Sequence, residues 1–205
     1  GLLWVGWFGF NGGSALGASS RAVFAIVSTH LSACAGAIAW TALEWLHRGK
    51  PSVLGMISGA VAGLGMITPA SGYVAPWAGL VIGLVGGLLC YWFCTWLKLK
   101  LGYDDSLDVF GVHGVGGLVG TLMVGVFCSS QITATAEGAG PAGLIEGSLT
   151  QLGIQAVAVV VVTVWCALGT WIALKLTSFV TPLRVAPDQE REGLDLALHG
   201  ESLHA

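Results

Sequence analysis

A single histidine, His113, lies in an apolar stretch shortly after three carboxylates, Asp104, Asp105 and Asp108. Beyond Asp108, no further charged side chain occurs before Glu137. Ionisable groups inside a membrane are costly when charged, so their presence indicates a functional role by default. Neutral imidazole offers one hydrogen-bond donor and one acceptor, which suits a group lining a polar path. A structural histidine bonded to a neighbouring helix is the alternative interpretation of His113.

A second cluster of aromatic and polar residues contains Trp7, Phe10, Asn11 and Ser14, with glycines among them. In an apolar segment, the amide and the hydroxyl either bond to a neighbouring helix or line a polar vestibule. Phe10 is either a core aromatic or the plug of a pore. The spacing alone slightly favours the packing role.

The amino-acid composition indicates whether these residues lie in water or in a membrane. The 205 residues are 55% hydrophobic and only 9% charged, and the mean hydropathy is +0.81. Soluble proteins average about 25% charged residues. We therefore expect an integral membrane protein. The net charge of -3 leaves no basic patch, which argues against a nucleic-acid partner.

Apolar stretches long enough to cross a membrane recur along the chain. A spanning helix needs about 20 residues. We therefore predict an all-α polytopic membrane protein, with a transmembrane domain fragment over 1–177 and a cytoplasmic C-terminal tail over 178–205. The six expected spans are about 1–18, 23–46, 52–67, 77–97, 108–128 and 149–174.

Basic residues orient these spans, because short cytoplasmic loops retain Lys and Arg. Arg21 falls on one side of the expected bundle. The seven others fall on the opposite side: Arg48, Lys50, Lys98, Lys100, Lys175, Arg184 and Arg191. The tail and the loop with the three carboxylates are therefore expected to be cytoplasmic. Aromatic residues near span ends are expected interfacial anchors: Tyr73, Trp77, Tyr91 and Trp96.

Glycine spacing predicts how the spans pack. Glycines recur every three residues from Gly111 to Gly120 and every four from Gly55 to Gly63. In lipid, small residues let helix backbones approach closely. We therefore expect the span over 108–128 to be central, with His113 pointing into the bundle.

The cysteines offer little chemistry. Cys90 and Cys94 are four residues apart and would suit a metal pair, but no histidine or carboxylate neighbours them, so packing is the default interpretation. No metal site and no cofactor are expected. An enzyme is the least favoured class because no nucleophile–base set is visible. A complete six-helix channel of another family is also disfavoured, because no internal inverted repeat is visible.

Five motifs, taken in order, resemble one family. Together they resemble the C-terminal half of an ammonium transporter of the Amt/Mep/Rh family, of the bacterial Amt type. The motifs are Gly6–Ala15, Arg48–Ser52, Thr68–Tyr73, Asp108–Val115 and Glu190–Asp195.

The resemblance implies a fold of eleven helices, five and five related as inverted repeats, followed by a last long helix, in a homotrimer. This chain would hold helices six to eleven, which are the second inverted repeat and the last helix. The chain opens at Gly1 without an initiator Met, and we expect it to lack its N-terminal part. Inverted repeats place the substrate path at their interface, so the fragment alone is not expected to transport.

The resemblance also implies roles for individual residues in a hydrophobic pore that carries ammonium or ammonia. His113 resembles one of the pore's paired histidines, which would act as a relay. Phe10 resembles one of two stacked phenylalanines that close the outer pore. Ser14 resembles a hydroxyl that helps to hold ammonium in the outer vestibule, and Trp7 resembles a pore-lining tryptophan.

At the inner mouth, Asp105 and Asp108 resemble structural carboxylates that anchor the loop and the tail. The expected partners are ammonium or ammonia, membrane lipid, and a PII-type signal protein at the cytoplasmic face. The expected location is the cell inner (plasma) membrane, as a multi-pass protein with a cytoplasmic C-terminus. An ammonium sensor of the same fold, signalling through the tail, is the alternative function.

Overall fold

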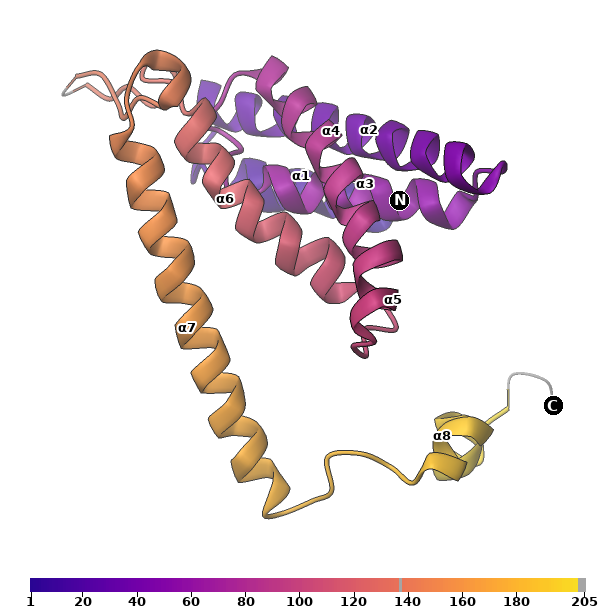
Figure 1. The fold of residues 1–205 in the computed structure, drawn as a ribbon. Helices are drawn as coiled ribbons and strands as arrows, with labels where there is room; N and C mark the ends of the chain where they lie inside the picture. The colour runs from indigo at the N-terminus through magenta and orange to yellow at the C-terminus, as the bar shows by residue number, and fades with distance from the viewer. Residues whose placement is uncertain (137, 203–205) are drawn as a thin grey trace. The chain divides into compact units, whose positions relative to one another are not determined.

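Every regular element among residues 1–136 and 138–202, which the computed structural model describes, is a helix (Figure 1). Three short π-helices, η1 (Phe93–Leu97), η2 (Phe110–Gly114) and η4 (Asp195–His199), and one 3-10 turn, η3 (Leu144–Glu146), accompany the α-helices. The α-helices are α1 (Leu2–Gly13), α2 (Ser20–Arg48), α3 (Val53–Ile67), α4 (Pro76–Trp92), α5 (Lys98–Leu101), α6 (Val115–Phe127), α7 (Thr150–Ser178) and α8 (Pro187–Glu192).

Local sequence signals account for the main helix boundaries. The side chain of Ser19 accepts a hydrogen bond from an amide in the first turn of α2, and Ser52 does the same for α3. Pro76 occupies the first position of α4, where a missing N–H costs nothing. Gly49 and Gly102 end α2 and α5 in the left-handed conformation, with φ of 73° and 64°.

The centre of the first unit, residues 1–159, is a close contact of α2, α3 and α4 through small residues (Figure 1). A Cβ added at Gly59 of α3 would lie 2.5 Å from the carbonyl oxygen of Gly36 in α2. The hydroxyl of Ser32 donates a hydrogen bond of 2.8 Å to the carbonyl oxygen of Gly63. The glycine spacing from Gly55 to Gly63 thus corresponds to a helix contact, as expected.

The continuous helix formed by η2 and α6 packs on α3 along one side. A Cβ at Gly120 would clash with the carbonyl oxygen of Met66, whereas one at Gly117 would have no neighbour within 4 Å. Met66 and Val124 belong to a buried apolar cluster that also includes Ile82 of α4. The sequence predicts a central position for this segment, but within the first unit it packs against other helices on one side only.

Helix lengths differ from the expected spans at several points. Four of the described helical runs are long and apolar enough to cross a membrane: 20–48, 76–101, 110–127 and 150–178. The helix α3, with 15 residues, and α1, with 12, are shorter. The helix α1 ends at Gly13 instead of continuing to 18, and Leu16 adopts a positive φ of 55°. The span expected from 108 begins at 110 because Asp108 has a φ of 56°, which is incompatible with a right-handed helix.

One expected interfacial anchor is wrong. Tyr91 is buried, with 5% exposure, and its ring meets the ring of Trp40 edge-on at 5.4 Å. Its hydroxyl lies 3.2 Å from Nδ1 of His47. Tyr91 is therefore a core residue, because the face of α4 that carries it packs against α2.

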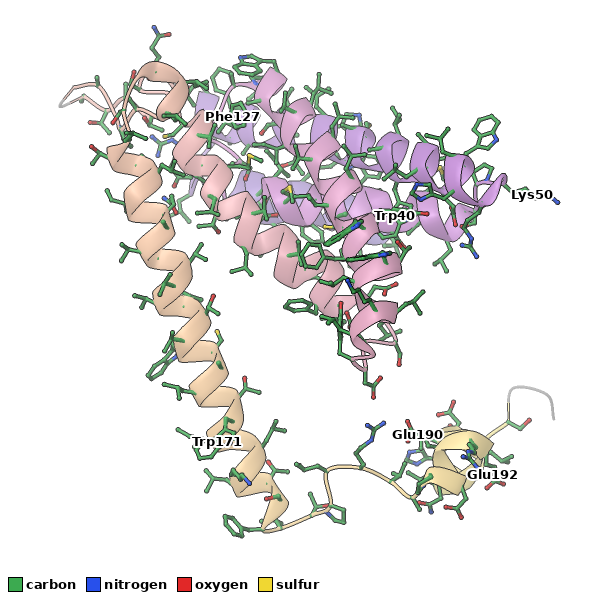
Figure 2. All side chains as sticks on the ribbon, in the orientation of Figure 1. Trp40, Lys50, Phe127, Trp171, Glu190 and Glu192 are labelled. Atoms are coloured by element: carbon green, nitrogen blue, oxygen red, sulfur yellow. The ribbon has the colours of Figure 1, made fainter. Side chains whose placement is uncertain are left out.

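The second unit begins at residue 160 and contains the rest of α7, followed by α8 and η4. The helix α7 continues to Ser178, past the expected end at 174, and its side chains, such as Trp171, project outward (Figure 2). In the tail, Arg184 pairs with Glu190 at 2.9 Å. Residues 203–205 of the expected tail, and Glu137 of the long loop, lie outside the described residues.

Candidate functional site

Three of the expected site residues lie on one side of α1. Trp7, Phe10 and Ser14 are three and seven positions apart, which places them along one helix face. The ring of Phe10 is 62% exposed and meets the ring of Trp7 edge-on at 6.1 Å. The hydroxyl of Ser14 donates to the carbonyl oxygen of Phe10 at 2.7 Å. The structure therefore brings these three side chains together and leaves the phenyl ring open.

The adjoining side of α1, which carries Asn11 and Gly12, is a packing surface. The amide nitrogen of Asn11 donates to the hydroxyl of Thr29 in α2 at 2.8 Å, and both side chains are buried. A Cβ at Gly12 would lie 2.7 Å from the side chain of Ile26. The packing interpretation therefore holds for Asn11. It does not hold for Phe10, which is exposed.

Trp7, Phe10 and Ser14 together are called the α1 face below. Trp7 is half-buried and links this face to the end of α3. Its Nε1–H donates to the hydroxyl of Thr68 at 2.7 Å, and that hydroxyl donates in turn to the carbonyl oxygen of Leu64. The sequence placed Thr68 in the motif Thr68–Tyr73 but indicated no contact with Trp7. A threonine at the end of an apolar helix gives no signal that distinguishes it from an ordinary cap.

His113 lies in η2, the π-turn that begins the helical run continued by α6. Such turns frequently mark functional positions. Gly111 and Val112 are buried against α4 and η1, with the thiol of Cys90 donating to the carbonyl oxygen of Val112 at 3.7 Å. His113 is exposed on another side, and no hydrogen bond or ring contact of its imidazole is found among the described residues. Within the first unit, His113 therefore lies on the exposed side of this helix, and its place in the complete bundle stays a prediction.

The two site regions lie on different elements that share one neighbour. The helix α3 contacts α1 and also η2, whereas no hydrogen bond or ring contact joins His113 to Trp7, Phe10 or Ser14 among the described residues. Figure 1 shows α1, α3 and α6 within the same helix group. The exposed side of η2 that carries His113 is called the His113 face below. The α1 face and the His113 face therefore both adjoin α3, but they do not form a closed site.

The carboxylates before His113 organise the start of its helix. Asp105 accepts hydrogen bonds from the amides of Val109 at 2.8 Å, Phe110 at 3.0 Å and Gly111 at 3.3 Å. Asp108 pairs with the ammonium of Lys98, which also donates to the carbonyl oxygen of Asp105. A carboxylate at a helix N-terminus is stabilised by the free amides and by the helix dipole. Both aspartates therefore anchor this loop.

Tyr103 lies in the same loop. Burial raises the pKa of Tyr103, and the charge of Asp105 adds to that shift. The hydroxyl of Tyr103 is buried without a hydrogen-bond partner, and its ring contacts Phe110 edge-on at 5.8 Å. The phenol therefore stays neutral and acts as a packing group beside the cap.

At the opposite end of the spans, Glu146 and Arg21 hold the long loop between α6 and α7. Glu146 accepts a hydrogen bond from the amide of Ser130 at 2.9 Å, and this bond holds the pKa of Glu146 below its usual value. The guanidinium of Arg21 lies 5.6 Å from the ring centre of Tyr73 and donates to the carbonyl oxygen of Thr133 at 3.5 Å. The single basic residue on this side thus has a structural role.

Within the described residues, no group of three His, Cys, Asp or Glu side chains could hold a metal ion. Cys90 bonds to a backbone carbonyl, and the Sγ of Cys94 occupies the space where a Cβ at Gly111 would lie. Both thiols therefore pack against η2.

The helical fold and long apolar helices define a multi-pass membrane protein. The sequence model of the Ammonium Transporter Family matches residues 1–203, and the chain belongs to this family. Family members of this kind are transporters and not enzymes, in agreement with the expectation from sequence.

Relatives of known name support this assignment. The ammonium transporter of Bacillus subtilis is 42% identical over 203 residues, which cover 99% of this chain and 49% of the relative. The putative ammonium transporter of Methanothermobacter thermautotrophicus is 48% identical over 202 residues, which cover 98% and 49%. The chain therefore spans about half the length of these relatives.

Solved structures share the fold. The crystal structure of Saccharomyces cerevisiae Mep2 matches with a TM-score of 0.83 and 38% identity, over 91% of this chain and 42% of that one. A structure described as a sensor Amt protein matches with a TM-score of 0.80 and 34% identity, over 96% and 46%.

Proposed function

We propose that this chain supplies part of the conduction path of a membrane transporter for ammonium or ammonia. The exposed imidazole of His113, which has no bonding partner among the described residues and lies on an apolar helix, carries the proposal. Membership of the ammonium transporter family and the 42–48% identity to named ammonium transporters support it.

We also propose that the chain corresponds to helices six to eleven of an eleven-helix protein. Its length, about half that of its relatives, supports this arrangement. In an inverted-repeat transporter the path lies between the two repeats. The open faces of His113 and Phe10 would then be completed by the other half, which explains why polar and aromatic side chains are exposed within a membrane helix group.

The state of the His113 ring supports a histidine relay. Transfer of an ammonium ion into an apolar constriction is expensive because the charge loses its water, so loss of a proton lowers the barrier. Ammonia needs only weak hydrogen bonds. A neutral imidazole presents one donor and one acceptor to it, and a second imidazole from the other half would continue the line. Because nothing in the described chain bonds to His113, both nitrogens are available.

The α1 face fits the outer entrance of this path. Because the Ser14 hydroxyl uses its proton on the carbonyl of Phe10, its oxygen lone pairs remain as acceptors for an ammonium ion. Phe10, exposed beside Ser14, would act as one half of a gate. Trp7, fixed to Thr68, would hold the wall behind that ring.

The test is uptake of methylammonium by cells that lack their own ammonium transporters and express the complete protein. His113→Ala is compared with His30→Ala, a matched control in α2 whose ring packs 5.5 Å from Trp4. We expect His113→Ala to reduce uptake or to change ion selectivity, and His30→Ala to preserve both. Unchanged rate and selectivity in His113→Ala would exclude the pore assignment.

An ammonium sensor is the second candidate, favoured by the similarity to a solved sensor Amt protein. Both functions would use the same binding face. A transport measurement distinguishes the two functions. A sensor would bind ammonium in the complete protein without transporting methylammonium at a measurable rate.

The assembly and the location are further parts of the proposal. A homotrimer and a PII-type partner at the cytoplasmic face follow from the resemblance to the family. A C-terminus in the cytoplasm follows from the basic residues, such as Lys98 and Lys100, that follow the spans. Cross-linking of the complete protein in its membrane, and protease access to the tail from each side, would test both.

A further inference from the structure

A groove of about 950 Å³ lies between the end of α2 and the continuous run of α4, η1 and α5. His47 and Arg48 line one wall, and Trp92, Trp96 and Lys100 line the other. None of these residues belongs to the α1 face or the His113 face. Both helices end here, α2 at Gly49 and α5 at Gly102, so the groove lies where two spans leave the membrane on their basic side.

The rim of the groove is cationic. The side chain of Arg48 is 69% exposed, and only its Nη1 is engaged, 3.0 Å from Oε1 of Glu44. The ammonium of Lys100 lies 4.5 Å from the ring centre of Trp96 and pairs with no carboxylate among the described residues. None of the described carboxylates lines the groove, because Glu44 is buried behind Arg48 and accepts the hydrogen bonds of Ser52. The rim therefore favours an anion.

The floor of the groove is apolar and aromatic. Trp92 and Trp96 stack with their ring centres 4.6 Å apart and their planes inclined by 24°. Both rings are partly exposed, and the neighbouring Leu99 is 79% exposed. Tryptophan and leucine at this depth contact acyl chains, whereas Arg and Lys extend toward the headgroups.

We propose that this groove binds an anionic phospholipid, with the headgroup phosphate between Arg48 and Lys100 and an acyl chain along Trp92, Trp96 and Leu99. Basic pockets between membrane helices on the cytoplasmic side bind such headgroups. The apolar floor distinguishes a lipid from a free phosphate ion, which would contact only the rim. The proposal does not depend on ammonium transport.

The test measures lipid binding to the complete protein, purified in detergent, by native mass spectrometry. Phosphatidylglycerol is compared with phosphatidylcholine of the same acyl chains. Lys100→Gln removes a cation without breaking an ion pair. Lys50→Gln is the matched control, because Lys50 is an exposed neighbouring cation that does not line the groove (Figure 2). Lys100→Arg preserves the charge.

We expect wild type to prefer phosphatidylglycerol. Lys100→Gln should lower that affinity about fivefold, as expected for one basic residue at an anionic surface. Lys50→Gln and Lys100→Arg should bind as wild type does, and melting temperatures identify any variant that misfolds. Three results would overturn the proposal: no preference in wild type, an equal loss in Lys50→Gln, or full competition by glycerol phosphate, which would indicate a soluble ligand.

Discussion

Two regions of the first unit use glycine in opposite ways. Where α2 meets α3, Gly36 and Gly59 bring the two backbones into direct contact, and neither position has room for a methyl group. On the exposed side, a Cβ added at Gly9, beside Phe10, or at Gly117, one turn after His113, would meet no other described residue within 4 Å. The first region is completed within this chain. The second leaves its side chains exposed, which is the arrangement that a path shared with another segment would require.

The largest expected effect is the loss of the first contact. Gly59→Ala places a methyl group against the backbone of Gly36, which cannot move without separating the helices. We expect a loss of about 3 kcal/mol in stability, at the upper end for an overpacked core. Gly9→Ala, with free space, should be neutral or stabilising by about 0.5 kcal/mol. Thermal unfolding in detergent compares the two, and equal destabilisation would contradict the contrast.

The second prediction concerns the loop that starts the helix of His113. Asp105→Ala removes the acceptor for three backbone amides. We expect a loss of about 1–2 kcal/mol, as for other helix caps. Hydrogen exchange at Val109, Phe110 and Gly111 should rise accordingly. Asp105→Asn retains an oxygen acceptor but not the charge, so its stability should lie between those of wild type and Asp105→Ala. If Asp105→Asn lost as much stability as Asp105→Ala, the stabilisation would come from the charge alone.

The third prediction separates the exposed α1 face from the scaffold. Phe10→Ala removes a ring that is 62% exposed, so stability should change by less than about 0.5 kcal/mol. Methylammonium uptake or its selectivity in the complete protein should change. Phe8→Ala is the matched control, since its ring packs on His30 at 5.9 Å and not beside Trp7. A stability loss in Phe10→Ala larger than in Phe8→Ala would make Phe10 a core residue.

The smallest expected effect depends on pH. The amide of Ser130 lowers the pKa of Glu146 in the folded protein. The carboxylate therefore stabilises the long loop above the pKa it has when unfolded, and this contribution is lost as the pH falls through the lower folded value. The protection factor of the Ser130 amide against hydrogen exchange, which corrects for the intrinsic effect of pH on exchange, should fall over that acidic range in wild type. Glu146→Gln should abolish this pH dependence, and a persistent dependence would assign it to another group.

Much of the scaffold could be predicted from local signals. Apolar length indicated the spans, Ser52 and Gly49 marked helix ends, and the glycine spacing from Gly55 to Gly63 indicated a helix contact that the structure contains. The cap formed by Asp105 also follows from an aspartate placed just before an apolar helix. The hydrogen bond from Trp7 to Thr68 could not be predicted, because it joins residues 61 positions apart.

The sequence by itself determined that the chain belongs in a membrane, roughly where its apolar helices lie and which of its residues are candidates for chemistry. Only the tertiary structure decided which side of each helix is buried: Asn11 and Tyr91 face neighbouring helices, whereas Phe10 and His113 are exposed. The physical reason is that a membrane helix is apolar all round, so hydropathy does not distinguish a packed face from an open one. Close contacts such as that of Gly36 with Gly59 make this selection.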